Sequence, residues 1–161
     1  MEMLIAPIVI IVATLAAAST GGAFRPGAWY EALNKPVWTP PNWMFPLVWS
    51  VLYAAMAFAA WLVWDASGPA AWMALLLYAA QLVANGLWSY LFFGRRRMDW
   101  ALAEVALLWI MIAALAAMFW SHSQLAGLLI LPYLAWVSIA ALLNLRMVQL
   151  NGPKGPAPSE A

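Results

Sequence analysis

Long uncharged apolar stretches alternate with short polar segments along this chain. No Asp, Glu, Lys or Arg occurs in the segments 3–24, 36–64, 66–94 and 105–145. A membrane-spanning helix needs roughly 20 apolar residues, so the first three segments can each hold one helix. The fourth can hold two, divided by the polar run Ser121-His122-Ser123-Gln124. The pattern therefore predicts five spans, over residues 3–23, 43–64, 70–93, 98–120 and 124–147.

The composition agrees with a bilayer as the solvent of this chain. Hydrophobic residues make up 67% of the sequence and charged residues 8%, whereas soluble domains are about 45–50% apolar and about 25% charged. We expect an all-α membrane protein with one five-helix domain over residues 1–150. Residues 151–161, rich in Pro, Gly and small polar residues, are expected to be disordered. The absence of cysteine excludes disulfides and thiolate metal sites.

The distribution of charge predicts the orientation of the helices. Five crossings place the termini on opposite sides, and all seven basic residues then fall on the C-terminal side: Arg25, Lys35, Arg95, Arg96, Arg97, Arg146 and Lys154. The other side carries Glu2, Asp65 and His122. The positive-inside rule places the C-terminus in the cytoplasm and the N-terminus outside.

The depth of the aromatic residues suggests a pocket. Most of the 12 tryptophans lie near span ends, as expected for interfacial aromatic belts, but Trp49, Trp88, Trp109 and Trp136 lie deeper. At about 100° per residue, Gln81, Asn85, Trp88 and Phe92 share one face of the third helix. We expect this face to look inward and the opposite face, with Ala79, Val83, Gly86 and Tyr90, to meet lipid or a second subunit. Comparable aromatic stripes contain Trp49 in the second helix and Trp136 in the fifth.

Three polar residues inside the spans each allow two interpretations. Asn85 and Asn144 either join helices by hydrogen bonds or provide polar contacts in an apolar ligand pocket. Glu104 is either a functional intramembrane acid or a shallow residue that pairs with Arg95–Arg97.

The first loop, residues 25–41, has the sequence RPGAWYEALNKPVWTPP. Its prolines restrain the backbone, and Trp29, Tyr30 and Trp38 add apolar surface. A lid over an apolar ligand would use these residues. The alternative is a loop that lies in the headgroup layer.

Three blocks of this sequence resemble the translocator protein family, also called TspO/MBR or the peripheral benzodiazepine receptor family. They are NKPVWTPPNWMFPLVWSVLY, QLVANGLWSYLFFGRRR and LPYLAWVSIAALLN. The resemblance implies a five-helix, commonly homodimeric bundle, here a bacterial member. It also implies binding of porphyrins and other tetrapyrroles, sterols, and synthetic isoquinoline or benzodiazepine ligands. The family's ligand contacts correspond to Tyr30, Trp38, Pro41, Phe45, Trp49, Tyr53, Asn85, Trp88, Trp136, Ala140 and Leu143.

The resemblance also implies an alternative activity. In some members the tryptophans that match Trp49 and Trp136 are associated with light- or oxygen-dependent porphyrin breakdown, so these would be the catalytic residues of an enzyme. The sterol motif of animal members has Tyr where this chain has Leu145, which weakens the expectation of sterol binding.

Three functions follow from these observations. The first is a binding protein for tetrapyrroles that acts as a sensor, regulator or transporter. The second is a porphyrin-degrading enzyme, and the third is an assembly scaffold without a ligand. The sequence has no phosphate-binding loop, paired carboxylates, nucleophile triad or metal-ligand spacing, so we expect no cofactor, no metal site and no nucleic-acid partner.

Overall fold

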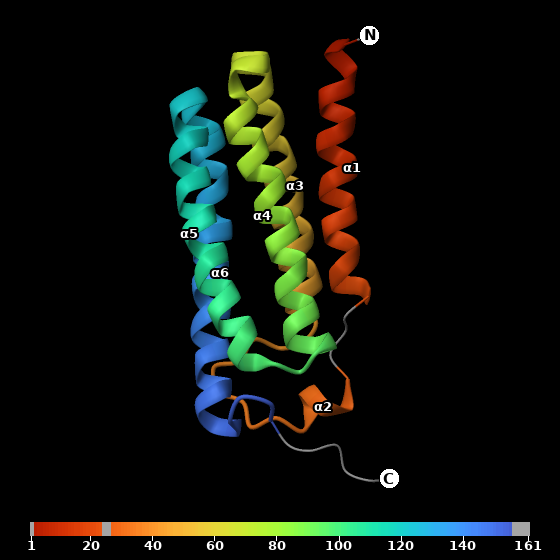
Figure 1. Cartoon of the computed structure of the whole chain (residues 1–161), viewed down its shortest axis with the longest axis vertical. Coiled ribbons are helices and arrows are strands. Elements are labelled where there is room, and N and C mark those ends of the chain that lie inside the picture. The colour runs from red at the N-terminus through yellow and green to blue at the C-terminus, as the bar shows by residue number, and fades with distance from the viewer. Residues whose placement is uncertain (1, 24–26, 156–161) are drawn as a thin grey trace.

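The computed structural model describes residues 2–23 and 27–155. Five long helices run along one common axis, and a short helix lies across one end (Figure 1). The helices are α1 (Glu2–Ala23), α2 (Ala28–Glu31), α3 (Met44–Ser67), α4 (Trp72–Ser89), α5 (Met98–His122) and α6 (Gln124–Asn151). A 3₁₀ turn, η1 (Gly68–Ala71), joins α3 to α4, and a π-helical segment, η2 (Tyr90–Gly94), extends α4. Within the described ranges the chain has no strand.

Length and apolarity give four candidate membrane-spanning segments, which agree with the predicted spans. They are Ile5–Ala23, Met44–Gly94, Met98–His122 and Gln124–Asn151. The second is 51 residues long and contains both α3 and α4, which η1 folds back against each other (Figure 1). The predicted bundle of five long helices is therefore confirmed. The chain is a multi-pass integral membrane protein.

Local chemistry explains where the helices break. Between α3 and α4, Gly68 has a φ of 52°, a conformation that disfavours other residues, and Pro69 starts the next turn. Between α5 and α6, Ser123 is extended and its hydroxyl accepts a hydrogen bond from the amide of Ala126 at 3.3 Å. This serine is the N-cap of α6. The polar run Ser121–Gln124 thus separates α5 from α6 because Ser123 caps the N-terminus of α6.

Helices α5 and α6 pack together most extensively, and α1 packs against α3 and α4. Gly86 of α4 lies so close to α1 that an added Cβ would meet the Thr20 methyl at 3.2 Å. The expectation that Gly86 faces lipid or a second subunit is therefore wrong, because this glycine faces α1 of the same chain. Ala79 and Val83 are exposed, as expected for that face.

The first residues of the expected disordered tail take part in the fold. Asn151 ends α6, the Met98 amide donates to the Pro153 carbonyl at 3.0 Å, and the Trp29 indole donates to the Lys154 carbonyl at 3.2 Å. These bonds hold the chain against the bundle as far as Lys154. Residues 156–161 of that tail lie outside the described part of the chain.

Candidate functional site

A chain of hydrogen bonds connects α3, α4 and α6 inside the bundle. The Tyr53 hydroxyl donates to Asn85 Oδ1 at 3.0 Å, and Asn85 Nδ2 donates to the Tyr133 hydroxyl at 2.9 Å. Tyr133 in turn donates to Gln81 Oε1 at 3.0 Å. We call Tyr53, Gln81, Asn85 and Tyr133 the polar network. It satisfies polar groups that would be costly to leave unpaired in an apolar interior.

The three deep tryptophans of the predicted stripes lie around this network. Trp49 packs against Tyr53 and Tyr133, with ring centroids 5.5 and 6.0 Å apart. Trp136 meets Phe45 edge-on at 5.8 Å, and Trp88 stacks on Phe92 at 5.1 Å. Trp49, Trp88 and Trp136 are all partly buried and pack against the core, as predicted for inward-facing stripes.

Trp109, the fourth deep tryptophan, does not join them. It is 39% exposed on the outer side of α5, where its indole donates to the Ser138 hydroxyl at 2.8 Å. The position of Trp109 is therefore explained by its hydrogen bond to α6 and not by a pocket.

The loop 27–41 lies across the end of the bundle where α4 and α6 end (Figure 1). Tyr30 is buried and contacts Phe93 at 5.6 Å and Phe92 at 6.4 Å between ring centroids. Burial raises the pKa of the Tyr30 hydroxyl, and neighbouring Glu31 raises it further. Leu33 is buried in the same cluster, together with Leu143 of α6. The loop therefore covers the basic end of the bundle.

Paired amides fasten this loop to α6. The Asn34 amide donates to Asn151 Oδ1 at 2.7 Å, and Asn151 Nδ2 donates back to the Asn34 carbonyl at 2.9 Å. The predicted position of the loop over the aromatic end is thus consistent with its contacts.

Two of the predicted site residues are exposed. Trp38 is 47% exposed, and Pro41 is exposed and accepts a hydrogen bond from the Met44 amide at the start of α3. Ala140 of α6 is partly buried. The structure thus brings together the predicted residues on α3, α4 and α6, with Tyr30 above them, whereas Trp38 and Pro41 are exposed.

Glu104 does not pair with the arginine cluster. Arg97 instead holds Asp99 in a bidentate pair at 2.8 and 2.6 Å and lies 4.1 Å above the Trp100 ring. Glu104 is 8% exposed, and neither carboxyl oxygen has a hydrogen-bond partner within the described residues. The prediction of an interfacial ion pair is wrong because α5 turns Glu104 toward the interior.

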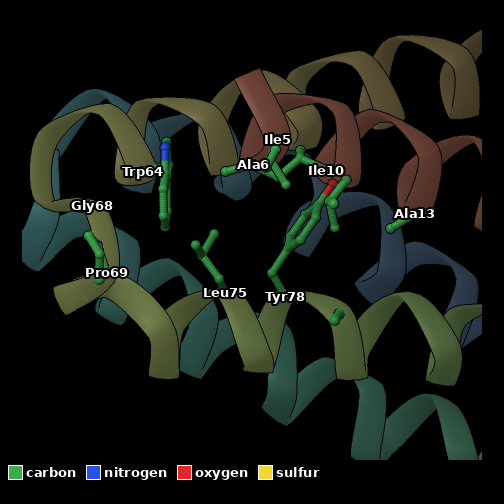
Figure 2. Close-up of a pocket in the computed structure, with 11 residues that line it drawn as sticks. Ile5, Ala6, Ile10, Ala13, Trp64, Gly68, Pro69, Leu75 and Tyr78 are labelled. Carbon is green, nitrogen blue, oxygen red and sulfur yellow. The ribbon is translucent and has the colours of Figure 1, made fainter. Parts of the chain in front are cut away.

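A hollow lies at the opposite end of the bundle, between α1 and the α3–α4 hairpin. Figure 2 shows this groove of about 680 Å³, with the rings of Trp64 and Tyr78 beside Ile10 and Leu75. Its lining is almost entirely apolar. None of the predicted site residues lines it.

Comparison with known protein families covers the helices and the loop described above. The model of the TspO/MBR family matches residues 5–150. The chain belongs to the TspO/MBR family. That match spans all five long helices and the loop over their basic end, so the resemblance of the three sequence blocks is confirmed.

Named relatives of this TspO/MBR protein come from bacteria and animals. "Protein CrtK" of Rhodobacter capsulatus is 41% identical over 92% of this chain and 94% of its own. "Tryptophan-rich sensory protein" of Cereibacter sphaeroides is 45% identical over 84% and 85%. "Translocator protein" of Homo sapiens is 41% identical over 72% and 70%. These relatives support placement of the protein in a bacterium.

Sequence reasoning missed Tyr133, the residue that joins most of the polar network. Its ring is fully buried, and its hydroxyl contacts both Asn85 and Gln81. A signal was present, because Tyr133 stands three residues before Trp136 and so shares its helix face.

Proposed function

We propose that this membrane protein binds flat hydrophobic ligands of the tetrapyrrole class between α3, α4 and α6, beneath the loop 27–41. The observation that carries the proposal is the gathering of Trp49, Trp88 and Trp136 around a hydrogen-bonded polar network. Apolar and aromatic walls with a few placed polar groups are the usual composition of a small-molecule site.

The ring geometry favours a planar ligand. Aromatic pairs in edge-on or offset arrangements contribute about 0.5–1.5 kcal/mol each beyond their buried area. A planar macrocycle that enters between the indoles would exchange ring–ring contacts such as Phe45–Trp136 for ring–ligand contacts of the same kind. The names of the relatives, sensory protein and translocator protein, agree with ligand recognition in a membrane. In this proposal the basic end faces the cytoplasm, and two copies form a homodimer.

The test is a binding titration with protoporphyrin IX, followed by the shift of its main absorption band in detergent. Trp136→Leu is expected to raise the Kd about tenfold, because roughly 1.4 kcal/mol of ring contact is lost. Trp72→Leu is the control, since Trp72 is 61% exposed at the other end of the bundle. An unchanged Kd in the Trp136 variant, or an equal change in both variants, contradicts the proposal.

The same mixture, illuminated in air, separates binding from turnover. A binding protein leaves only general bleaching that persists in the double variant Trp49→Phe, Trp136→Phe. Conversion to one discrete product that this variant abolishes would instead assign the enzymatic role to the two indoles.

A further inference from the structure

The chain turns back at the end of α6 and lies against the loop that covers the basic end of the bundle (Figure 1). We call residues 152–155 the tail segment. The Met98 amide, at the start of α5, donates to the Pro153 carbonyl at 3.0 Å. The Trp29 indole, in the loop, donates to the Lys154 carbonyl at 3.2 Å. The tail segment is therefore bonded to both the loop and α5.

Gly155 makes the closest approach of the tail segment to the loop. A Cβ added to this glycine would lie 2.7 Å from Leu33 Cδ2 and 3.2 Å from Trp29 Nε1. Because Leu33 is only 5% exposed, its side chain has little room to move aside. The φ of Gly155 is 71°, a conformation that residues with a side chain rarely adopt. Glycine at this position thus allows the tail segment to lie directly against the loop.

Trp29 connects the tail segment to the aromatic residues of the proposed pocket. Its ring meets Phe92 edge-on with centroids 5.9 Å apart, and Phe92 stacks on Trp88 at 5.1 Å. The guanidinium carbon of Arg96 lies 6.0 Å from the Trp29 ring. An outward movement of the loop must carry Trp29 away from Phe92, and this movement breaks the hydrogen bond from its indole to the tail segment.

The attachment of the tail segment lies at the surface and is reversible. Pro153 and Lys154 are exposed, so water can replace the donors to their carbonyls when the segment detaches. Segments with few buried contacts and exposed hydrogen bonds open far more often than the core of a protein. The tail segment can therefore release the loop while the five long helices stay packed.

We propose that the tail segment is a latch that holds the loop 27–41 closed and limits the rate at which ligands enter and leave the pocket. The inference rests on the proposed function, to which it adds the regulation of access. Opening of a covering loop often sets the rate of binding and release. Because the latch touches the loop and not the pocket, it changes the association and dissociation rates by similar factors and leaves the Kd nearly unchanged.

The first measurement is hydrogen exchange of the full-length protein in detergent without ligand. It follows the amides of Glu31, Ala32 and Leu33, which bond to carbonyls within the loop. Gly155→Ala is expected to speed their exchange at least about fivefold, because the added methyl overpacks the contact with Leu33. Trp29→Phe removes the indole donor but keeps an aromatic ring, and we expect an increase of about fivefold for the loss of one hydrogen bond.

Each variant has a matched control. Gly68→Ala introduces the same change at a glycine that also has a positive φ, 52°, but lies at the opposite end of the bundle, where an added Cβ would meet nothing within 4 Å. Trp38→Phe is the control for Trp29→Phe, because Trp38 belongs to the same loop and is 47% exposed. The loop amides of both controls should exchange at the wild-type rate.

The second measurement tests the control of access. Rapid mixing with protoporphyrin IX, followed by its absorption, gives the association rate, and dilution of the complex into excess empty micelles gives the dissociation rate. In Gly155→Ala we expect both rates to rise by about the factor by which exchange of the loop amides rises, while the Kd stays close to that of the wild-type protein. Gly68→Ala should leave both rates unchanged.

The possible failures are distinguishable. Unchanged exchange in both Gly155→Ala and Trp29→Phe, or an equal increase in Gly68→Ala, shows that the tail segment does not hold the loop. Faster exchange with unchanged ligand rates, or a change in Kd through one rate alone, overturns the control of access and leaves the proposed function standing. Failure of the wild-type protein to bind protoporphyrin IX overturns the proposed function, whereas the exchange comparison, made without ligand, still decides whether the tail segment holds the loop.

Discussion

Tyr133 is the residue on which the interior polar network depends. Its hydroxyl accepts from Asn85 Nδ2 and donates to Gln81 Oε1, so one phenol connects two amides of α4 to α6. Burial is complete at this ring. In such an environment a hydroxyl that both donates and accepts is hard to replace, because its removal leaves Asn85 Nδ2 and Gln81 Oε1 without partners.

We therefore expect Tyr133→Phe to destabilise the protein by about 1–3 kcal/mol, the usual cost of unsatisfied buried groups. The measurement is thermal unfolding of the purified protein in detergent. Tyr53→Phe is the matched control, because Tyr53 has one hydrogen bond in the network and is only partly buried. A smaller loss in the Tyr53 variant supports this role; equal stability of both variants and the wild-type protein contradicts it.

At the scale of helices, the turn between α5 and α6 depends on a very close approach. A Cβ added to Gly127 would lie 2.8 Å from the Cβ and 2.9 Å from the Cα of Trp120. Both atoms belong to, or are fixed by, the backbone of α5, so neither can move aside without shifting the helix. The most extensive helix pair of the fold thus begins at a position where only hydrogen fits.

Gly127→Ala is expected to cost about 1–3 kcal/mol, as overpacking of a close contact usually does. Gly21→Ala is the control, since a Cβ at Gly21 of α1 would meet nothing within 4 Å. That change should be neutral or slightly stabilising, because alanine favours a helix. Thermal unfolding compares the two variants, and a stable Gly127→Ala protein would refute the close-contact argument.

Two hydrogen bonds between Asn34 and Asn151 attach the loop 27–41 to the end of α6. Asn151→Ala removes both hydrogen bonds to Asn34, which together hold the loop against α6. At about 1 kcal/mol per bond, the loss of both bonds should make the loop amides exchange hydrogen roughly thirty times faster.

Hydrogen exchange measured by mass spectrometry over residues 27–41 tests this expectation. Gln149→Ala is the control, because Gln149 is exposed and accepts a hydrogen bond from Arg146 on the same helix. Equal exchange in the two variants would indicate that Tyr30 and Leu33, not the asparagines, hold the loop.

The sequence was sufficient to predict the long helices but not all of the contacts between them, for physical reasons. The lack of charge over a span length fixes each crossing independently of the others, and the predicted and observed helices differ at their ends by a few residues. Which residue of a helix meets which neighbour depends instead on how the helices are arranged, and the angles within a single helix do not contain this information. Gly86 was therefore predicted to meet lipid or a second subunit, whereas it faces Thr20 of α1. Glu104 was open to an ion pair with the arginines, whereas the rotation of α5 about its axis buries it.

The whole molecule has a strong asymmetry of charge. The basic residues within the described ranges lie at the end of the bundle that holds α2 and the C-terminal end of α6, and Asp65 and His122 lie at the other end. In bacteria a concentration of Lys and Arg keeps short loops in the cytoplasm. We therefore expect the end with α2 to be cytoplasmic.

Because the natural chain has no cysteine, single introduced thiols report this orientation directly. Ser121→Cys, at the end of α5, should react with a membrane-impermeant maleimide in intact cells, after the outer barrier is opened where one exists. Lys154→Cys, on the exposed chain after α6, should react only after the cell membrane is broken.

The opposite pattern of labelling would place the basic end outside, against the charge rule, and would turn the proposed pocket away from the cytoplasm. Labelling of both sites in intact cells would indicate that two orientations coexist. Arg95–Arg97, three of the seven basic residues, stand together in the short segment between η2 and α5. Replacing these three arginines with glutamine should therefore shift some molecules to the inverted orientation, whereas replacing Lys154 alone should not. That comparison separates a topology set by local charge from one set by the packing of the finished bundle.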